Sequence, residues 1–457
     1  MQTSASTVLP ISLKRVIHLW WPLAASWVLM GMELPAVSAV TARLPDPEIN
    51  LAAYGGIVFP LSLIIEAPII MLLAASTALS KNWDSYVKVR RFMMRTGAIL
   101  TLLHVLVAFT PLYYVVVERI IGAPPEIVEP ARIGLMIMTP WSWAIAFRRF
   151  NQGVLIRFDH SQAVGIGTAI RLGGNFAGLA VGYALGTLPG IVVAPAAVII
   201  GVLSEAIYIG LRVRPVLRDE LRPASTVMPA LNFPEFIGFY IPLALTSFLQ
   251  LLFQPIGSAA MSRMPLPIES LAVWPVLSGL SFMLRSAGVA YNEVVVALLD
   301  EPGSTPALRR FAGLLSLGLT ALQALIGLTP LALWWFAGVS GLRPDLAQMA
   351  RLSFLLSLPL PAFSVLQSWY QGILVHSRNT RGIPESMALS VISIGAVMAV
   401  GVIVGQVTGL YIAVVGLAAG FAVQTAWLWV RSRSAMKALH TRDELPLALG
   451  ADSAATR

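Results

Sequence analysis

The chain has 457 residues, of which 57% are hydrophobic and 12% charged, and its mean hydropathy is +0.78. A soluble domain carries about 25% charged residues, so lipid rather than water is the main solvent expected for this chain. It contains no cysteine, which excludes disulfides, cysteine-held zinc and iron–sulfur clusters, and its five histidines fall in separate segments, so no metal site is expected.

Hydropathy predicts an all-α polytopic membrane protein with twelve transmembrane helices. Each span needs roughly 20 apolar residues to cross the hydrocarbon. Only helices satisfy their own backbone groups in lipid, and no alternating strand pattern occurs, so a barrel is not expected. The spans are expected at 16–42, 51–80, 92–121, 131–156, 161–184, 189–213, 234–261, 269–299, 310–339, 347–375, 383–406 and 408–431.

The distribution of basic residues predicts the orientation. With the N-terminus in the cytoplasm, 23 of the 31 Lys and Arg residues fall on the cytoplasmic side and six on the other, while Arg171 and Arg285 lie within spans. This asymmetry predicts that both termini are cytoplasmic, in a multi-pass protein of a bacterial-type inner (plasma) membrane. The net charge of +9 is then explained by topology, and no nucleic acid is expected as a partner.

An internal repeat relates the two halves at a shift of 219 to 220 residues. Pro22 and Pro35 in the first span correspond to Pro242 and Pro255 in the seventh, and Arg43 corresponds to Arg263. Further matches occur in the loops and in the fourth and tenth spans. Two six-helix lobes of the same polarity are therefore expected, with the solute path between them. The predicted boundaries are 14–213 for the N-terminal lobe, 214–233 for a cytoplasmic linker, 234–432 for the C-terminal lobe and 433–457 for a disordered tail.

The paired prolines predict kinks in helices 1 and 7, because each proline removes one backbone hydrogen bond. A helix that bends or straightens is suited to gating. Membrane helices also tolerate prolines as static kinks, so both roles stay open for these four residues.

Polar and charged residues at membrane depth are the candidates for a binding site. Burying a charge in the bilayer costs at least about 2.5–3.5 kcal/mol, so such residues face a partner or a water-filled cavity. Glu66 corresponds by the repeat to about Arg285, so the two either meet across the lobes or line one cavity. The candidate substrate- or ion-binding residues are Glu33, Glu66, Arg171, Asn175, Gln250, Arg285, Asn292 and Glu293.

Other charged residues receive a structural interpretation. Arg148, Arg149 and Arg157 are expected to be headgroup or loop anchors. Glu205, near the cytoplasmic end of its span, is expected to have a structural role. No nucleotide-binding loop, clustered catalytic groups or second soluble domain is present in the sequence, so an enzyme is not expected, nor an ATP-driven pump unless a separate subunit supplies the ATPase.

The lobe pattern and a set of motifs resemble the multidrug/oligosaccharidyl-lipid/polysaccharide (MOP) superfamily, which includes the MATE extruders. The motif Pro242-Leu-Ala-Leu, with Gln250, Pro255-Ile256, Ser262-Arg263 and Tyr291-Asn292-Glu293, is most similar to the progressive ankylosis (ANK) membrane-protein family. Pro22-Leu-Ala followed by Glu33 also resembles that family, one position short. An acidic residue that the family has one turn before the helix-1 Glu is absent here.

The resemblance implies a MATE-like secondary transporter, and the ANK branch implies export of small polyanions such as citrate, ATP or pyrophosphate. The expected function is alternating-access export of a small anionic or amphipathic solute, by a monomer with no cofactor other than a coupling proton or sodium ion. The alternatives are a coupled drug/cation antiporter and a lipid-linked precursor flippase. A major facilitator would need glycines in the loop KNWDSYVKVRR, which has none, and a membrane scaffold would not need charges at mid-membrane in both halves.

Overall fold

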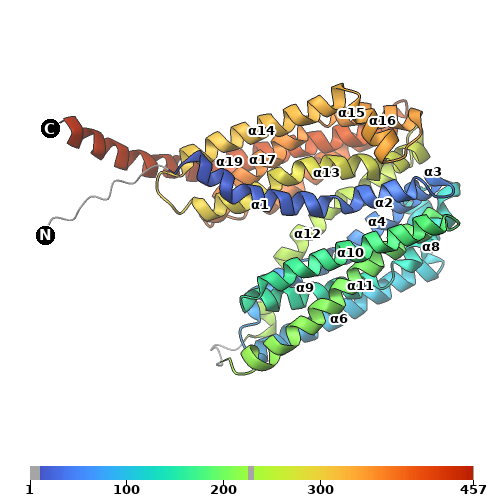
Figure 1. Cartoon of the computed structure of the whole chain (residues 1–457), viewed down its shortest axis with the longest axis horizontal. Helices are drawn as coiled ribbons and strands as arrows, with labels where there is room; N and C mark the ends of the chain where they lie inside the picture. The colour runs from blue at the N-terminus through green and yellow to red at the C-terminus, as the bar shows by residue number, and fades with distance from the viewer. Residues whose placement is uncertain (1–10, 225–230, 456–457) are drawn as a thin grey trace.

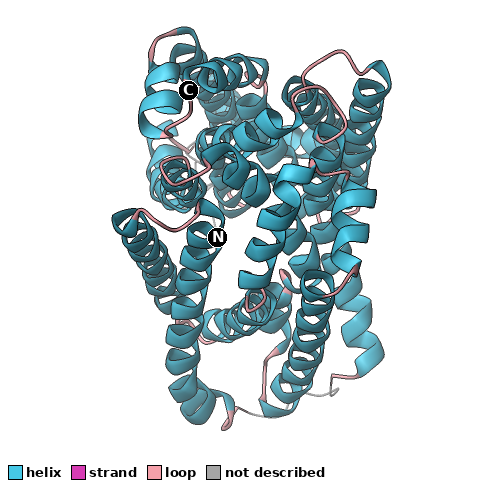
Figure 2. Cartoon of the chain, turned by 90° about the vertical axis from the view of Figure 1, so that its right-hand side faces the viewer, coloured by secondary structure: helices cyan, strands magenta, loops and turns pink. Residues whose placement is uncertain are grey.

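The computed structural model describes the backbone of residues 11–224 and 231–455, and the side chains up to residue 443. Within these ranges the chain consists of helices and loops with no strand, as Figure 2 shows. Ten helices are long and apolar enough to cross a membrane, or eleven if α16 and α17, bent by 40° at their junction, count as one span. The all-α polytopic prediction is confirmed.

Of the twelve expected spans, the fourth is the one that falls short of this apolar composition. It corresponds to α8 and α9, and α9 carries Arg148, Arg149 and Arg157.

The helices of the first half are α1 (Leu13–Gly31), α2 (Glu33–Thr41), α3 (Pro47–Leu51), η1 (Ala52–Val58), α4 (Phe59–Glu66), η2 (Ala67–Ile69), α5 (Leu72–Leu79), α6 (Trp83–Phe109), α7 (Leu112–Tyr114), η3 (Val115–Ile121), α8 (Pro125–Ile137), α9 (Trp141–Arg157), α10 (Ser161–Leu185), α11 (Gly190–Val216) and η4 (Leu217–Leu221).

The second half repeats this order. Its helices are α12 (Phe233–Met261), α13 (Pro267–Leu298), α14 (Thr305–Leu328), α15 (Leu331–Leu333), η5 (Trp334–Val339), α16 (Pro344–Leu356), α17 (Leu360–His376), α18 (Gly382–Val404) and α19 (Gly409–Ala455). The expected linker, 214–233, is shorter in the structure, because helix continues to Leu221 and α12 begins at Phe233; residues 225–230 lie outside the described part.

The tail expected to be disordered, 433–457, has helical backbone where the structure describes it, and residues 456–457 lie outside that part. The helix α19 runs without a break to Ala455. The buried Asp443 carboxylate anchors it, accepting hydrogen bonds from the backbone N–H groups of Gly303 (2.9 Å) and Thr305 (3.0 Å). The polar composition of the tail concealed this contact with the start of α14.

The helices form two bundles that stand apart near the chain termini and converge at the opposite end (Figure 1). At the converging end, glycines let the bundles approach closely. A Cβ on Gly55 would lie 2.3 Å from Pro275, and a Cβ on Gly279 would lie 2.9 Å from Pro35. Side chains larger than hydrogen would therefore push the two bundles apart at this end.

Two helices cross from one bundle to the other. The helix α1 packs on α13 and α14 of the C-terminal lobe, while its continuation α2 packs between α13 and the helices α10 and α11 of the N-terminal lobe. In the same way, the first part of α12 contacts the N-terminal lobe, where Tyr240 donates a hydrogen bond to the Pro68 carbonyl and packs edge-on against Phe92. Each of these two helices therefore packs partly on the lobe other than the one to which the repeat assigns it.

The first predicted span is broken at Met32, between α1 and α2. Pro35 explains the position of the break, because a proline cannot bond to the carbonyl four residues earlier, which is that of Gly31. By contrast α12, with Pro242 and Pro255 inside it, is one unbroken helix.

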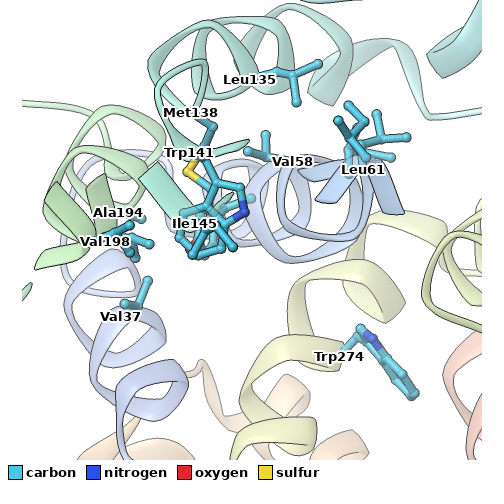
Figure 3. Close-up of a cluster of buried hydrophobic side chains, with 14 of the residues drawn as sticks. Val37, Val58, Leu61, Leu135, Met138, Trp141, Ile145, Ala194, Val198 and Trp274 are labelled. Carbon is cyan, nitrogen blue, oxygen red and sulfur yellow. The ribbon is translucent and has the colours of Figure 1, made fainter. Parts of the chain in front are cut away.

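The core of the N-terminal lobe surrounds the N-terminal part of α9. Figure 3 shows Trp141 and Ile145 of α9 gathered with Val37 of α2, Val58 of η1 and Val198 of α11. All five are buried. This packing fixes the face of α9 that carries Arg148 and Arg149, which lie three and four residues after Ile145.

Candidate functional site

A cavity of about 760 Å³ lies between the two lobes and is lined by residues of both. Seven of the eight binding residues predicted from the sequence line it, and these are Glu33, Glu66, Arg171, Gln250, Arg285, Asn292 and Glu293. The eighth, Asn175, is buried behind the wall and holds Glu33. The polar and charged residues expected at membrane depth thus lie together, and most of them line one cavity.

The N-terminal wall of the cavity carries a network of paired charges. The Glu33 carboxylate, at the first residue of α2, accepts hydrogen bonds from the Arg171 guanidinium and from Asn175 Nδ2 (3.0 Å). Arg171 and Asn175 are four residues apart and share one face of α10, as expected from their spacing. The Arg171 Nε also lies 3.4 Å from a Glu205 carboxylate oxygen, so the network continues into α11.

Glu205 forms the buried end of this network. Its side chain is fully buried, forms an ion pair with Arg148, and accepts a hydrogen bond from Gln152 Nε2 (2.8 Å). All these groups belong to the N-terminal lobe, the arrangement expected of a structural carboxylate. Two arginines therefore share two carboxylates, and the network as a whole is neutral.

The expectation that Arg148 and Arg149 are surface anchors is wrong. Both line the cavity, and the Arg148 side chain is only 8% exposed. The reason is that α9 continues to Arg157, so the two arginines lie in mid-helix and the exposed Arg157 marks its end. The spacing of four between Arg148 and Gln152 was the signal that a shared polar face faces inward.

Glu66 and Arg149 form fewer hydrogen bonds than the residues of this network. One carboxylate oxygen of Glu66 and the Nε of Arg149 are buried and have no hydrogen-bond partner among the described residues. Glu66 is 5% exposed. Of the two arrangements left open for Glu66 and Arg285, both side chains line one cavity, and within the described part of the chain they form no hydrogen bond or ion pair with each other.

The C-terminal wall carries one cation with no counterion. Arg285 of α13 has no ion pair or hydrogen bond within the described part of the chain, and its buried Nε is unsatisfied. Its guanidinium lies 5.0 Å from the centre of the Phe421 ring. A cation over an aromatic face gains some electrostatic stabilisation but keeps its donors free for a ligand.

Amides, hydroxyls and one carboxylate line the same wall as Arg285. The Asn292 side chain donates to the Ser368 carbonyl (3.0 Å), and the exposed Glu293 carboxylate accepts a hydrogen bond from Trp27 Nε1 (3.2 Å) of α1. Sequence reasoning chose Gln250 of α12 as a binding residue, whereas Gln254 of the same helix, two glutamines of α17 and one of α19 also reach the cavity. The glutamines lining the cavity are Gln250, Gln254, Gln367, Gln371 and Gln424.

Among the residues that the structure describes, no group of three or more His, Asp or Glu side chains could hold a metal ion. The chemistry available in the cavity is therefore that of guanidinium, carboxylate and amide groups. Such a site can bind and release an organic ion.

Comparison with known proteins gives a match in structure alone. No protein-family model matches the sequence, and no curated protein matches it. The inward-facing conformation of a multidrug resistance MATE family transporter of the MOP superfamily superposes with a TM-score of 0.70 at 16% identity, covering 92% of this chain and 99% of that one. This chain has the MATE fold.

Two further structures superpose on this chain with lower TM-scores. The outward-facing conformation of a MATE family transporter of the MOP superfamily gives a TM-score of 0.58 at 17% identity, over 96% of this chain and 99% of that one. The lipid II flippase MurJ in an inward closed conformation gives 0.60 at 12% identity, over 92% of each chain. At these identities the MATE fold is shared while the residues that bind a solute are not transferable.

Proposed function

We propose that the protein is a secondary transporter that exports a small anionic or amphipathic solute through the inter-lobe cavity by alternating access. Two observations support the mechanism. The bundles are in contact at one end and apart at the other, near the termini. The likeness is also greater to an inward-facing than to an outward-facing MATE structure, with TM-scores of 0.70 and 0.58.

The unpaired Arg285 is the observation that carries the choice of an anion. A buried charge without a partner is costly, and that cost is recovered when a counter-charged ligand binds. Of the other charges at the cavity, Arg171 and Arg148 are bonded to Glu33 and Glu205, and the lining residues Arg149, Glu66 and Glu293 have no ion pair among the described residues. The resemblance to the ANK family also favours polyanion export, and the five glutamines provide donors and acceptors for the rest of such a solute.

Coupling to a proton or sodium gradient is proposed for Glu66 in the first place. Glu33 already accepts two hydrogen bonds, whereas one oxygen of Glu66 is buried and unsatisfied among the described residues. This same carboxylate favours a second candidate function, a proton- or sodium-coupled cation antiporter, in which Glu66 would bind the drug or the ion.

Flux into proteoliposomes discriminates between these functions. Citrate, ATP and pyrophosphate are compared with an organic dye cation, using the wild type, Arg285→Ala, Arg285→Lys and Glu66→Gln, with the exposed Arg309→Ala as a charge-matched control. Anion flux that falls at least about tenfold in Arg285→Ala, and is retained in Arg309→Ala, supports the anion exporter, since one charge-assisted hydrogen bond accounts for such a factor.

Two other outcomes would overturn that choice. Dye flux that requires Glu66 and a proton gradient indicates the cation antiporter. Flux of neither class, with lipid-linked precursors scrambled across the bilayer, indicates a flippase like that of the MurJ neighbour.

A further inference from the structure

Two arginines at equivalent positions of the repeat reach across the lobe interface at the end opposite the termini. Arg43 follows α2 of the N-terminal lobe, and its Nη2 donates a hydrogen bond to the Gly338 carbonyl (2.6 Å) in the C-terminal lobe. Arg263 follows α12 and reaches the other way, donating to the carbonyls of Ile120 (2.7 Å) and Ile121. The contacts are reciprocal, one in each direction.

The acceptors are carbonyls in the last turns of two matching helices. Ile120 and Ile121 end η3, and Gly338 lies next to the end of η5. The last carbonyls of a helix have no partner in their own helix and lie at the negative end of its dipole. A planar guanidinium with five donors is well suited to bind several such carbonyls at once.

A glycine follows each of these helix ends and leaves room for the arginine. Gly122 and Gly341 both have φ of +75°, a left-handed conformation that favours glycine. A Cβ on Gly122 would lie 3.0 Å from Arg263 Cζ, and a Cβ on Gly341 would lie 3.0 Å from Arg43 Nη1. Both helix ends thus have the same shape and receive an arginine of the opposite lobe.

The repeat also contains a second pair of arginines that bind helix ends within their own lobe. Arg132 Nε donates to the Ala108 carbonyl (3.2 Å), and the equivalent Arg351 Nε donates to the Gly327 carbonyl (2.9 Å). The chemistry is the same as that of Arg43 and Arg263. The difference is that these bonds do not span two lobes and need not break when the lobes separate.

We propose that Arg43 and Arg263 are a pair of reciprocal latches that keep the cavity closed at the end opposite the termini, and that this end opens when both release their helix ends. An inter-lobe ion pair between Glu48 and Arg343 (2.8 Å) lies at the same end and adds to the closure. The acceptors are backbone carbonyls, so release requires movement of the lobes and no titration. The proposal rests on the alternating access of the proposed function, but its test requires no solute.

The absence of cysteine from the sequence allows a direct test of access. Ser278, which lines the cavity, is replaced by cysteine, and the protein is reconstituted in one orientation. A membrane-impermeant maleimide is then added to one side or the other. We expect labelling from the side of the termini to be faster in the otherwise unchanged protein. Arg43→Gln/Arg263→Gln is expected to raise the rate from the opposite side about tenfold, the effect of losing a charge-assisted hydrogen bond.

The matched control is Arg132→Gln/Arg351→Gln, which removes two arginine caps of the same kind. An equal rise in this control, or no rise in the latch variant, overturns the proposal. Arg43→Lys/Arg263→Lys keeps the charge and one donor, so an intermediate rate is expected; it also serves if the glutamine variant fails to fold, as gel filtration would reveal. Latch-dependent labelling without flux of any solute would refute the proposed function and leave the latches standing.

Discussion

Glu205→Gln is expected to destabilise the N-terminal lobe more than any exposed charge substitution in the chain. Glu205 is fully buried, forms an ion pair with Arg148, and lies 3.4 Å from the Nε of Arg171. Glutamine preserves the shape and can still bond to Gln152. It removes the carboxylate that is ion-paired with Arg148 in the described part of the chain, so that buried guanidinium loses its paired charge.

The size of the stability loss depends on Arg148, which stays buried after its ion-pair partner is removed. Removing one member of a buried ion pair costs about 3–5 kcal/mol, because the other charge stays desolvated. Arg171 keeps its bond to Glu33, and polar groups of an unfolded membrane protein also find partners, so the lower end of the range applies. The expected loss is about 3 kcal/mol, and Glu205→Gln/Arg148→Gln should recover part of it, since no unpaired charge is left at that position.

The free energy of unfolding is measured by titration with a denaturing detergent in mixed micelles. Glu385→Gln is the control, because Glu385 pairs with Arg431 (3.1 Å) at side-chain exposures of 41% and 36%. Solvent screens such a pair, and its loss is expected to cost less than about 1 kcal/mol. Equal losses in the two variants, or a double variant no more stable than Glu205→Gln, would refute the reasoning.

Two further predictions concern packing and the C-terminal helix. Gly153→Ala should cost about 1–3 kcal/mol in the same titration, because its Cβ would meet the Leu73 carbonyl oxygen at 2.4 Å, whereas Gly165→Ala, with nothing within 4 Å, should change stability by less than about 0.5 kcal/mol. Similar losses for the two alanines would contradict the packing of α9 on α5. Asp443→Asn should speed hydrogen exchange at the Gly303 and Thr305 amides, and unchanged exchange there would show that the contact does not hold α19.

Hydropathy and the repeat were sufficient to predict the fold class and most helices, because lipid imposes both helical structure and length. The same physics selected residues that line the inter-lobe cavity. Glu33, Glu66, Arg171 and Arg285 are expensive in lipid, so each had to face a partner or a cavity, and all four line the cavity.

What the sequence concealed depends on packing between distant segments. Arg148 and Arg149 follow an apolar stretch and resemble headgroup anchors, and their burial depends on α9 continuing two turns beyond them and on Glu205 lying opposite. The crossing of α1 to the C-terminal lobe and the anchoring of α19 by Asp443 likewise depend on contacts between residues more than 100 positions apart. No local pattern encodes such pairings.

The break in helix 1 lies between hydrogen bonds to opposite lobes, so it is a place where lobe movement can be absorbed. Before the break, Trp20 Nε1 donates to the Ala287 carbonyl (2.8 Å) and Trp27 to Glu293, which hold α1 on the C-terminal lobe. After it, the bond from Arg171 to Glu33 holds α2 on the N-terminal lobe. A change in the angle between the lobes therefore either bends the chain near Met32 or breaks one of these contacts. Glu33 is the first residue after the break, and it also lines the cavity. A solute bound in the cavity and a bend between α1 and α2 would therefore both affect the Glu33 carboxylate.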